Sequence, residues 1–479
     1  MRNIYDYAGD LPAEKERLTM NSAIILAAGE GTRMRSSQPK VLCRVLEEPM
    51  LGWVLDSVSE AGFAPENIGV VVGNGAEAVT EYMNKKGFSR TFLQAQRKGT
   101  GHAVMQAMPL IEESESVLVL YGDAPFIDAR TIRASLEAHK AGGNSVTVVS
   151  AEIDDPTGYG RIIRGADGEF LSITEQKDCS EAQRAIREIN SGVYWFSAAA
   201  LAKALPQLGT ANANGEYYLT DTIGVIRAAG LKAGIFRAEN PDIVLGANTR
   251  ANLLALNKIA RERVIEKHMA NGVEFICTDG IIIGKNVEIG AETLIYPNTI
   301  LRGETVIGKG CVIGPNSLIE NTEVGDDTAL NNVQAYDSKL GSGVKIGPFV
   351  HIRPGTTIRD GVKIGDFVEV KNSDIGEKTC IAHLTYVGDS DVGQDVNFGC
   401  GCVTANYDGI NKFRTVIGNH AFIGCNTNLV APVEIGENAT TGAGSTITGN
   451  VPADSLAVER TDTKIIEHWE KNSRRKRKI

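Results

Sequence analysis

A glycine-rich loop with two cations stands near the beginning of the sequence. It reads LAAGEGTRM (26–34), and Lys40 follows shortly after it. Gly29 and the glycine two residues later would let the backbone approach a phosphate closely, and Arg33 and Lys40 would neutralise its charge. The dinucleotide fingerprint needs a third glycine where Met34 stands, and a Walker loop needs a Gly-Lys-Ser/Thr that the sequence lacks. The loop therefore predicts a phosphate site of neither common type.

A carboxylate with a complementary role follows a later apolar run. The segment VLVLY (117–121) has the composition of a buried strand, and Gly122 and Asp123 come directly after it. A carboxylate at a strand end is placed to hold a hard cation such as Mg²⁺ against nucleotide phosphates. The alternative is that Asp123 forms a turn or caps a helix before Pro125. Combined with the cations above, Asp123 favours a site for nucleotide phosphates.

Short apolar strands alternate with amphipathic helices through the first half of the chain. We expect strands at 23–28, 68–73, 117–121, 145–150 and 193–196, and helices at segments such as 50–61 and 128–139. This order predicts an α/β fold, a mostly parallel sheet with helices on both faces. Ligands of such sheets bind beyond the carboxyl ends of the strands, so function should lie in the loops that follow them.

A different architecture begins after a single helix predicted at 248–269. Aliphatic residues then recur every six positions in three runs: Ile283, Ile289, Ile295, Leu301, Ile307, Ile313 and Ile319; Ile346, Ile352, Ile358, Ile364 and Val370; and Ile417, Ile423, Leu429 and Ile435. A hexapeptide period predicts a β-helix, in which each repeat is a short strand and a turn and the aliphatic side chain points inward. Glycine follows Ile283, Ile307, Ile364 and Ile423, and we expect these glycines to supply the backbone conformations of tight corners.

One segment without hexad phase, TANYDGINKFRT (404–415), interrupts the coil. We expect it to protrude as a loop, and in this architecture such a loop usually serves a binding site at a neighbouring subunit. The alternative is a tolerated insertion, but asparagine, tyrosine and lysine together are suited to binding polar ligands.

Composition narrows the functional classes. With 479 residues the chain needs more than one domain, and its net charge of −10 argues against general nucleic-acid binding. The exception is a tail with six basic residues in 471–478. The sequence has neither an apolar run of about 18 residues nor an apolar signal core, so we expect a soluble, cytoplasmic protein without membrane contact. The eight cysteines show neither a disulfide framework nor zinc spacing.

The motifs in combination resemble a known family. LAAGEGTRM, QAQRKGTGHA (94–103), YGDAP (121–125), DDPTGYGRI (154–162), EINSGVY (188–194) and NGEYYLTD (214–221) resemble sugar-nucleotide pyrophosphorylases, and HIRPGTT (351–357), AHLTYVGD (382–389) and NYDG (406–409) resemble an acetyltransferase of the hexapeptide class. In this order the motifs are most similar to the bifunctional uridyltransferase and acetyltransferase family that makes UDP-N-acetylglucosamine. The likeness runs from about Ser22 to Arg460 and implies a left-handed β-helix. The implied divisions are an N-terminal extension (1–21), a uridyltransferase domain (22–247), a linker helix (248–272), an acetyltransferase domain (273–452) and a basic tail (453–479).

For the first half, the resemblance implies sites for UTP and for N-acetylglucosamine 1-phosphate. Arg33 and Lys40 would be the catalytic cations, and Asp123 and Asn248 would hold Mg²⁺. The nucleotide and sugar would be bound by Leu26, Ala27, Ala28, Gly29, Lys40, Gln94, Gly99, Thr100, Tyr121, Gly122, Asp123, Gly160, Glu175, Asn190 and Asn248. Such a reaction requires positioning and charge neutralisation rather than a protein nucleophile.

For the second half, the resemblance implies acetyl transfer from acetyl-CoA to glucosamine 1-phosphate. His383 would be the general base, for which a near-neutral imidazole is suited. The sugar phosphate would be bound by Arg353, Lys371, Tyr386 and Asn397, and acetyl-CoA by Cys400, Asn406, Tyr407, Cys425, Ala443 and Arg460. Family members carry alanine at the position of Cys400 and serine at that of Cys425, so a thiol replaces a hydroxyl donor here.

The resemblance further implies a homotrimer with acetyl-transfer sites between chains, and a product that is a precursor of bacterial cell-wall polysaccharide. An alternative is a nucleotidyltransferase whose β-helix serves only for oligomerisation. That alternative predicts no base and no phosphate-binding cations in the coil, whereas His383, Arg353 and Lys371 are present.

Overall fold

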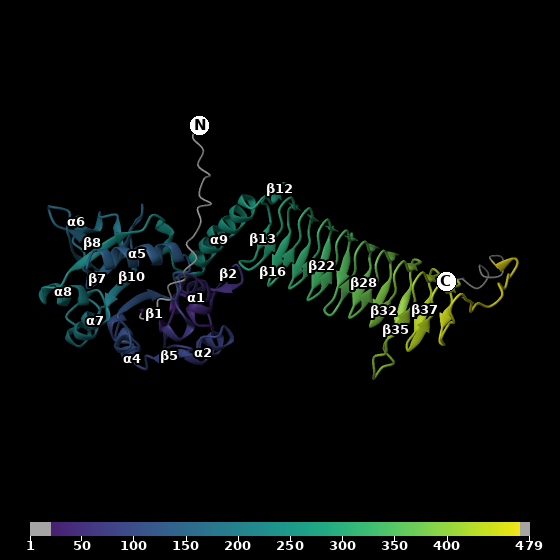
Figure 1. Cartoon of the computed structure of the whole chain (residues 1–479), viewed down its shortest axis with the longest axis horizontal. Helices are drawn as coiled ribbons and strands as arrows, with labels where there is room; N and C mark the ends of the chain where they lie inside the picture. Colours follow the sequence, from purple (N-terminus) through teal and green to yellow (C-terminus); the bar gives the residue numbers. More distant parts are fainter. Residues whose placement is uncertain (1–20, 470–479) are drawn as a thin grey trace, which may run out of the picture. The chain divides into compact units, whose positions relative to one another are not determined.

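The computed structural model describes residues 21–469, and the chain divides between Ala260 and Arg261 into two compact units (Figure 1). The extension before Asn21 and the basic residues of the tail lie outside the described part.

Within the described residues, the first unit is built on a nine-stranded sheet in the order β11-β7-β10-β6-β1-β4-β5, with β8 and β9 attached to β10. The strands are β1 (Asn21–Ala27), β4 (Ile68–Val72), β5 (Arg90–Leu93), β6 (Ser116–Tyr121), β7 (Val146–Glu152), β8 (Arg161–Arg164), β9 (Phe170–Thr174), β10 (Glu188–Ser197) and β11 (Ala233–Arg237). All five predicted strands are present. The expected parallel arrangement is confirmed except that β10 runs antiparallel to β6 and β7, and β8 antiparallel to β9 and β10.

A separate hairpin is formed by β2 (Arg44–Val45) and β3 (Glu48–Pro49).

Helices cover both faces of this sheet, as predicted. They are α1 (Met50–Glu60), α2 (Ala76–Lys85), α3 (Thr100–Gln106), α4 (Met108–Glu112), α5 (Ala129–Ala141), α6 (Glu181–Arg184), α7 (Ala198–Ala204) and α8 (Asp221–Ala228). Because side chains alternate along a strand, Ile25 of β1 joins one buried cluster with α1, α2 and α5, while Ile24 joins the other with α3, α4, α7 and α8. The helix predicted at 248–269 is α9 (Arg250–Ala270).

Most of the second unit is a parallel β-helix of three sheets. The first sheet contains β12 (Glu274–Phe275), β15 (Leu294–Ile295), β18 (Val312–Ile313), β21 (Ala329–Leu330), β24 (Lys345–Ile346), β27 (Lys363–Asp366), β30 (Cys380–His383), β33 (Asn397–Phe398), β36 (Phe422–Ile423), β39 (Thr440–Thr441) and β41 (Leu456–Ala457). The second contains β13 (Ile282–Ile283), β16 (Ile300–Arg302), β19 (Leu318–Glu320), β22 (Val333–Tyr336), β25 (Val350–Ile352), β28 (Glu369–Lys371), β31 (Tyr386–Gly388), β34 (Val403–Ala405), β37 (Asn428–Val430) and β40 (Thr446–Ile447). The third contains β14 (Glu288–Ile289), β17 (Val306–Ile307), β20 (Glu323–Val324), β23 (Lys339–Leu340), β26 (Thr357–Ile358), β29 (Asp374–Ile375), β32 (Ser390–Val392), β35 (Thr415–Ile417) and β38 (Val433–Ile435).

The hexad prediction is confirmed by burial. Each of the sixteen aliphatic residues named above is at most 8% exposed, so together they form the interior of the coil. Ile283 pairs with Leu301, which pairs with Ile319, 18 residues further on in each case. One coil therefore consists of three hexads at this point, and each sheet takes one strand from each coil.

The glycines that follow the aliphatic residues serve another purpose than the one expected. Gly308 and Gly424 do not have a positive φ, but a Cβ at Gly308 would lie 2.7 Å from the backbone N of Asp326, and one at Gly424 would lie 2.7 Å from that of Ala443. These glycines permit close approach of the next coil. Corners with positive φ are occupied by other glycines, such as Gly303 and Gly310, and by residues such as Asn298 and Asn316.

The segment without hexad phase leaves the coil between β34 and β35, and Figure 1 shows it as a loop beside β35. We call residues 406–414 the protruding loop. The side chain of Ile410 at its tip is 85% exposed. Protrusion is thus confirmed. Among the residues that the structure describes, we find no helix with the length and hydropathy needed to span a bilayer.

Candidate active sites

In the first unit, three predicted site residues meet at one point. The ammonium of Lys40 forms an ion pair with Asp123 Oδ2 and donates a 2.6 Å hydrogen bond to Asn248 Oδ1. The side chains of Lys40 and Asp123 are only 11% and 27% exposed. Two oxygens from distant parts of the chain therefore converge on one positive charge.

The parallel sheet explains this convergence. Strands β1 and β6 are neighbours, with Leu26 paired to Tyr121, and Gly122 N–H donates to Leu26 O at 2.9 Å. The glycine-rich loop and Asp123 thus leave the sheet at the same edge, as expected for the carboxyl ends of parallel strands. Asn248 reaches this edge from the segment just before α9.

Two cavities open at this edge. The first, of about 360 Å³, is lined by the predicted residues Leu26, Ala27, Ala28, Gly29, Arg33, Lys40, Gln94, Gly99, Thr100, Tyr121, Asp123 and Asn248. The second, of about 560 Å³, is lined by Gly160, Glu175 and Asn190 together with Arg33, Tyr121, Asp123 and Asn248. The four shared residues form the junction between the cavities. Gly122 lines neither cavity and instead joins the strand ends through its backbone.

Gly99 occupies a position in the first cavity that requires glycine. Its φ is +107°, and a Cβ there would lie 2.5 Å from the carbonyl oxygen of Tyr217. Gln94 Nε2 donates to Gly99 O at 3.1 Å, and Thr100 Oγ1 accepts from the backbone N–H of Leu219 at 3.0 Å. These bonds fix the wall of the cavity opposite the glycine-rich loop.

Two partly buried polar side chains of the second cavity, Asn190 and Glu175, are hydrogen-bonded to buried residues behind its wall. Asn190 Nδ2 donates to Tyr194 OH at 2.6 Å, and Thr220 Oγ1 donates to Glu175 Oε1 at 3.3 Å. Burial raises the pKa of the Glu175 carboxyl, with a smaller contribution in the same direction from Asp221. Burial likewise raises the pKa of Tyr121, so its hydroxyl stays protonated. The cavity offers hydrogen-bonding groups of the kind that select a sugar.

The oxygens at the junction fit a hard cation. An amide and a carboxylate oxygen are ligands that Mg²⁺ accepts, and the remaining positions would be filled by water or phosphate oxygens. In the described residues no cluster of three or more histidine, cysteine or acidic side chains is arranged for a metal. Asp123 and Asn248 are thus the two side chains at the junction that could hold such an ion.

In the second unit, four residues predicted for acetyl transfer stack in one column. The backbone N–H groups of the residues that follow Cys400, Cys425 and Ala443 donate to the carbonyls of His383, Cys400 and Cys425 at 3.3, 2.7 and 2.7 Å. Neighbouring strands lie about 4.8 Å apart, so this column spans about 14 Å from His383 to Ala443. Arg460 follows β41 in the same sheet and is exposed.

A polar cluster adjoins the column on the second sheet. Arg353 donates a 2.8 Å hydrogen bond to Glu369 Oε1, and Glu369 pairs across the strands with Tyr386. Tyr386 begins the strand that follows the His383 corner. The side chain of Lys412 in the protruding loop lowers the pKa of Lys371, as do burial and the charge of Arg353, while Asp389 opposes this effect. Three cations therefore lie close enough to influence one another.

Asn406, predicted for acetyl-CoA, joins this cluster. Its amide donates to Asp389 Oδ2 and lies 3.5 Å from Tyr386 OH. Tyr407 is 59% exposed and donates to Gly409 O within the protruding loop. Asn397 lies on β33 between Cys380 and Phe422, and within residues 21–469 no side-chain hydrogen bond links it to the cluster.

The two thiols of the column and the neighbouring Cys402 differ in accessibility. Cys425 is exposed and Cys400 is partly buried, whereas Cys402 is buried and hydrogen-bonded to Gly399 O and Gly424 O. Burial raises the pKa of the Cys402 thiol to about 11. Modification should therefore favour Cys425 and spare Cys402.

Some residues of these sites were missed from sequence. They include Arg97 and Glu216 in the first cavity and Asp389 in the polar cluster. Asp389 carried a signal, because it ends the quoted motif AHLTYVGD directly after a strand. Arg97 and Glu216 lie within or beside quoted motifs, but only the tertiary structure brings them to the cavity.

Comparisons with known proteins agree with this division. Residues 23–215 match the MobA-like NTP transferase domain, and 286–321, 337–372 and 414–449 match the bacterial transferase hexapeptide (six repeats). The bifunctional protein GlmU of Acetivibrio thermocellus is 45% identical over 93% of this chain and 96% of its own length. Those of Alkaliphilus metalliredigens and Thermoanaerobacter pseudethanolicus are 45% and 46% identical, over 93% of this chain and 97% and 96% of their own. The predicted family is confirmed: the chain belongs to the GlmU family of bifunctional enzymes, a nucleotidyltransferase joined to an acetyltransferase.

Proposed function

We propose that the chain makes UDP-N-acetylglucosamine in two steps. The second unit transfers an acetyl group from acetyl-CoA to glucosamine 1-phosphate, and the first unit then joins the N-acetyl product to the uridylyl group of UTP. The observation that carries this proposal is that one chain of the GlmU family contains both sites. The first unit has a cavity junction at Lys40 and Asp123 suited to phosphates, and the second has the column that begins at His383 beside a cluster of cations.

In acetyl transfer, His383 takes a proton from the amine of glucosamine 1-phosphate as its nitrogen attacks the acetyl thioester, and CoA leaves. Arg353 and Lys371 attract the phosphate group of the sugar. The column His383, Cys400, Cys425 and Ala443 would carry the extended acetyl-CoA away from the base, with Asn406, Tyr407 and Arg460 as further contacts and Asn397 as a sugar-phosphate contact.

In uridyl transfer, a phosphate oxygen of N-acetylglucosamine 1-phosphate attacks the α-phosphorus of UTP and pyrophosphate leaves. UTP would occupy the cavity at the glycine-rich loop, and the sugar the cavity at Gly160, Glu175 and Asn190. Lys40 and Arg33 neutralise phosphate charge and orient the two reactants at the junction of the cavities. When bound by Asp123 and Asn248, Mg²⁺ supplies charge neutralisation at the phosphates.

We further propose a homotrimer, on the likeness of the second unit to bacterial transferases with hexapeptide repeats, in which the polar side chains of the protruding loop would reach a neighbouring subunit. The proposed substrates are cytoplasmic metabolites, and the product would serve bacterial cell-wall synthesis. Light scattering would measure the number of subunits.

The test of function supplies glucosamine 1-phosphate, acetyl-CoA, UTP and Mg²⁺ and follows release of both CoA and pyrophosphate. We expect CoA release first and pyrophosphate release that depends on it. Pyrophosphate that appears only when N-acetylglucosamine 1-phosphate is added directly, without CoA release, would instead support a nucleotidyltransferase with a β-helix scaffold.

A further inference from the structure

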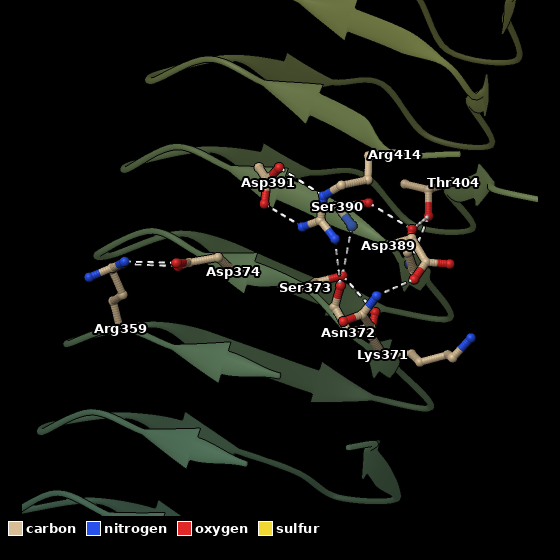
Figure 2. A network of polar contacts seen from close by, with 11 residues as sticks. Arg359, Lys371, Asn372, Ser373, Asp374, Asp389, Ser390, Asp391, Thr404 and Arg414 are labelled. Atoms are coloured by element: carbon tan, nitrogen blue, oxygen red, sulfur yellow. Dashed lines mark hydrogen bonds and ion pairs between the residues drawn. The ribbon is translucent and has the colours of Figure 1, made fainter. Parts of the chain in front are cut away.

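A buried carboxylate beneath the protruding loop has no role in the reactions above. Asp389 occupies a corner of the coil between β31 and β32 and is 5% exposed. Figure 2 shows Asn372, from the coil below, pointing its amide toward this carboxylate, and Asn372 Nδ2 donates to Asp389 Oδ1 at 2.5 Å. The other carboxylate oxygen accepts from Asn406. Both oxygens of Asp389 are therefore engaged by neutral amides.

Asp389 contacts both ends of the protruding loop. Asn406, whose amide it binds, is the first residue of the loop, and Thr415 N–H, just after the loop, donates to Asp389 O at 3.1 Å. The loop closes on itself above this point, since Phe413 N–H donates to Asn406 O at 2.9 Å and Tyr407 bridges to Lys412. One residue thus fixes where the loop leaves the coil and where it returns.

Arg414 adds a second anchor at the return end. Its guanidinium forms a bidentate pair with Asp391 and donates to Asn372 O at 3.2 Å (Figure 2). None of the contacts of this anchor involves Asn406, whose amide donates to Asp389 and lies 3.5 Å from Tyr386 OH.

The charge of Asp389 also faces the cations of the cluster. Burial alone would raise the pKa of the Asp389 carboxyl, but the hydrogen bonds from Asn372 and Asn406 lower it, and the charges of Lys371 and Lys412 add to this lowering. Arg414 is a further cation that feels the charge of Asp389. Conversely, Asp389 is the carboxylate that favours the charged form of Lys371 against the opposing effects of Lys412, burial and Arg353. Asp389 therefore stabilises a set of cations that would otherwise repel one another.

We propose that Asp389 is a positioning residue for acetyl transfer, which clamps the base of the protruding loop and holds Lys412 and Lys371 together as part of one site for the phosphate group of the sugar. This inference rests on the proposed acetyl transfer to a sugar phosphate.

The test replaces Asp389 with asparagine in the full chain. Asparagine tolerates the φ of +49° at this corner, so the backbone can be kept while the charge is removed. We expect the KM for glucosamine 1-phosphate to rise about tenfold or more, as for loss of a hydrogen-bonded charge, while kcat changes less. Uridyl transfer by the same preparation should stay within about twofold of the parent, which shows that the chain is folded.

The pH dependence separates this role from a purely structural one. Without Asp389, the pKa of Lys371 falls further because Lys412 and Arg353 remain beside it, so its charge is lost at lower pH. The alkaline rise in KM should therefore begin at lower pH in Asp389→Asn than in the parent. A structural defect alone would raise KM equally at all pH values.

Two further variants complete the design. Asp374→Asn removes a carboxylate that pairs with Arg359 on the same β-helix, away from Asn406, and should leave the KM unchanged. Asn372→Gly removes one hydrogen bond to Asp389 but keeps the charge of Asp389. It should raise the KM for glucosamine 1-phosphate modestly without moving the pH profile. This variant is used in place of Asp389→Asn if the latter does not fold. A KM within twofold of the parent in Asp389→Asn, or a change without a pH shift, overturns the inference. Absence of acetyl transfer in the parent chain overturns the proposed function instead.

Discussion

Replacing Lys40 with methionine should have opposite effects on metal binding and on catalysis. The ammonium of Lys40 contacts both oxygens proposed to hold the metal, Asp123 Oδ2 and Asn248 Oδ1. A divalent ion that uses these oxygens must displace the ammonium. Methionine has a similar length and no charge, so it removes the competitor while it keeps most of the packing.

The size of the effect follows from the burial of the pair. Exposed ion pairs contribute up to about 1 kcal/mol, and breaking a fully buried pair costs about 3–5 kcal/mol. With Lys40 11% and Asp123 27% exposed, we place this pair at about 1–2 kcal/mol, between those limits. Removal of the ammonium should therefore strengthen binding of a divalent ion about five- to thirtyfold.

The assay titrates Mn²⁺, as a probe of the Mg²⁺ site, into the full chain without nucleotide and follows free Mn²⁺ by electron paramagnetic resonance. Uridyl transfer by the same variant should fall about a hundredfold or more, because a phosphate loses its cation. The matched control is Lys85→Met, since Lys85 is exposed and pairs with Glu81 one helical turn away. Mn²⁺ affinity that is unchanged or weaker in Lys40→Met would refute the competition.

Three further predictions concern single groups. His383→Ala should lower acetyl transfer by about 10²–10⁴-fold and leave uridyl transfer unchanged, and equal loss of both activities would contradict a base at His383. A maleimide should react first at the exposed Cys425 and block acetyl transfer alone, whereas a Cys400→Ala/Cys425→Ser variant should resist it; loss of uridyl transfer at the same rate would count against this. Burial raises the pKa of the Glu175 carboxyl, so the folded state favours its protonated form and loses stability as pH rises through that pKa. Glu175→Gln should therefore raise the melting temperature at about pH 7, with the difference vanishing below about pH 4, and a lower melting temperature at pH 7 would contradict the sign.

The first unit shows what a pattern of strands can and cannot predict. Burial of β1 and β6 makes both strands nearly continuous apolar runs, so their positions could be identified and the loops after them named as the site. The antiparallel direction of β10 could not, because a buried strand has the same composition in either direction. Nor does local sequence predict that Asn248, 208 residues after Lys40, accepts its hydrogen bond; that contact depends on how the segment before α9 returns to the sheet edge.

In the second unit, the length of one coil explains both which stacked residues could be predicted from the sequence and which could not. In a β-helix, residues separated by the length of one coil stack on each other. Cys425 and Ala443 stack in this way, since 18 residues separate them. Cys400 and Cys425 are 25 residues apart, more than the 18 of one coil. They stack because the additional residues between them leave the coil in the protruding loop. The hexad period therefore accounts for the stacking of Cys425 and Ala443 after the loop, whereas His383 and Cys400 before it are 17 residues apart, one short of three hexads. Across the loop, the alignment requires the two ends of the loop to be held together, and the side chain and the carbonyl of Asp389 provide that contact.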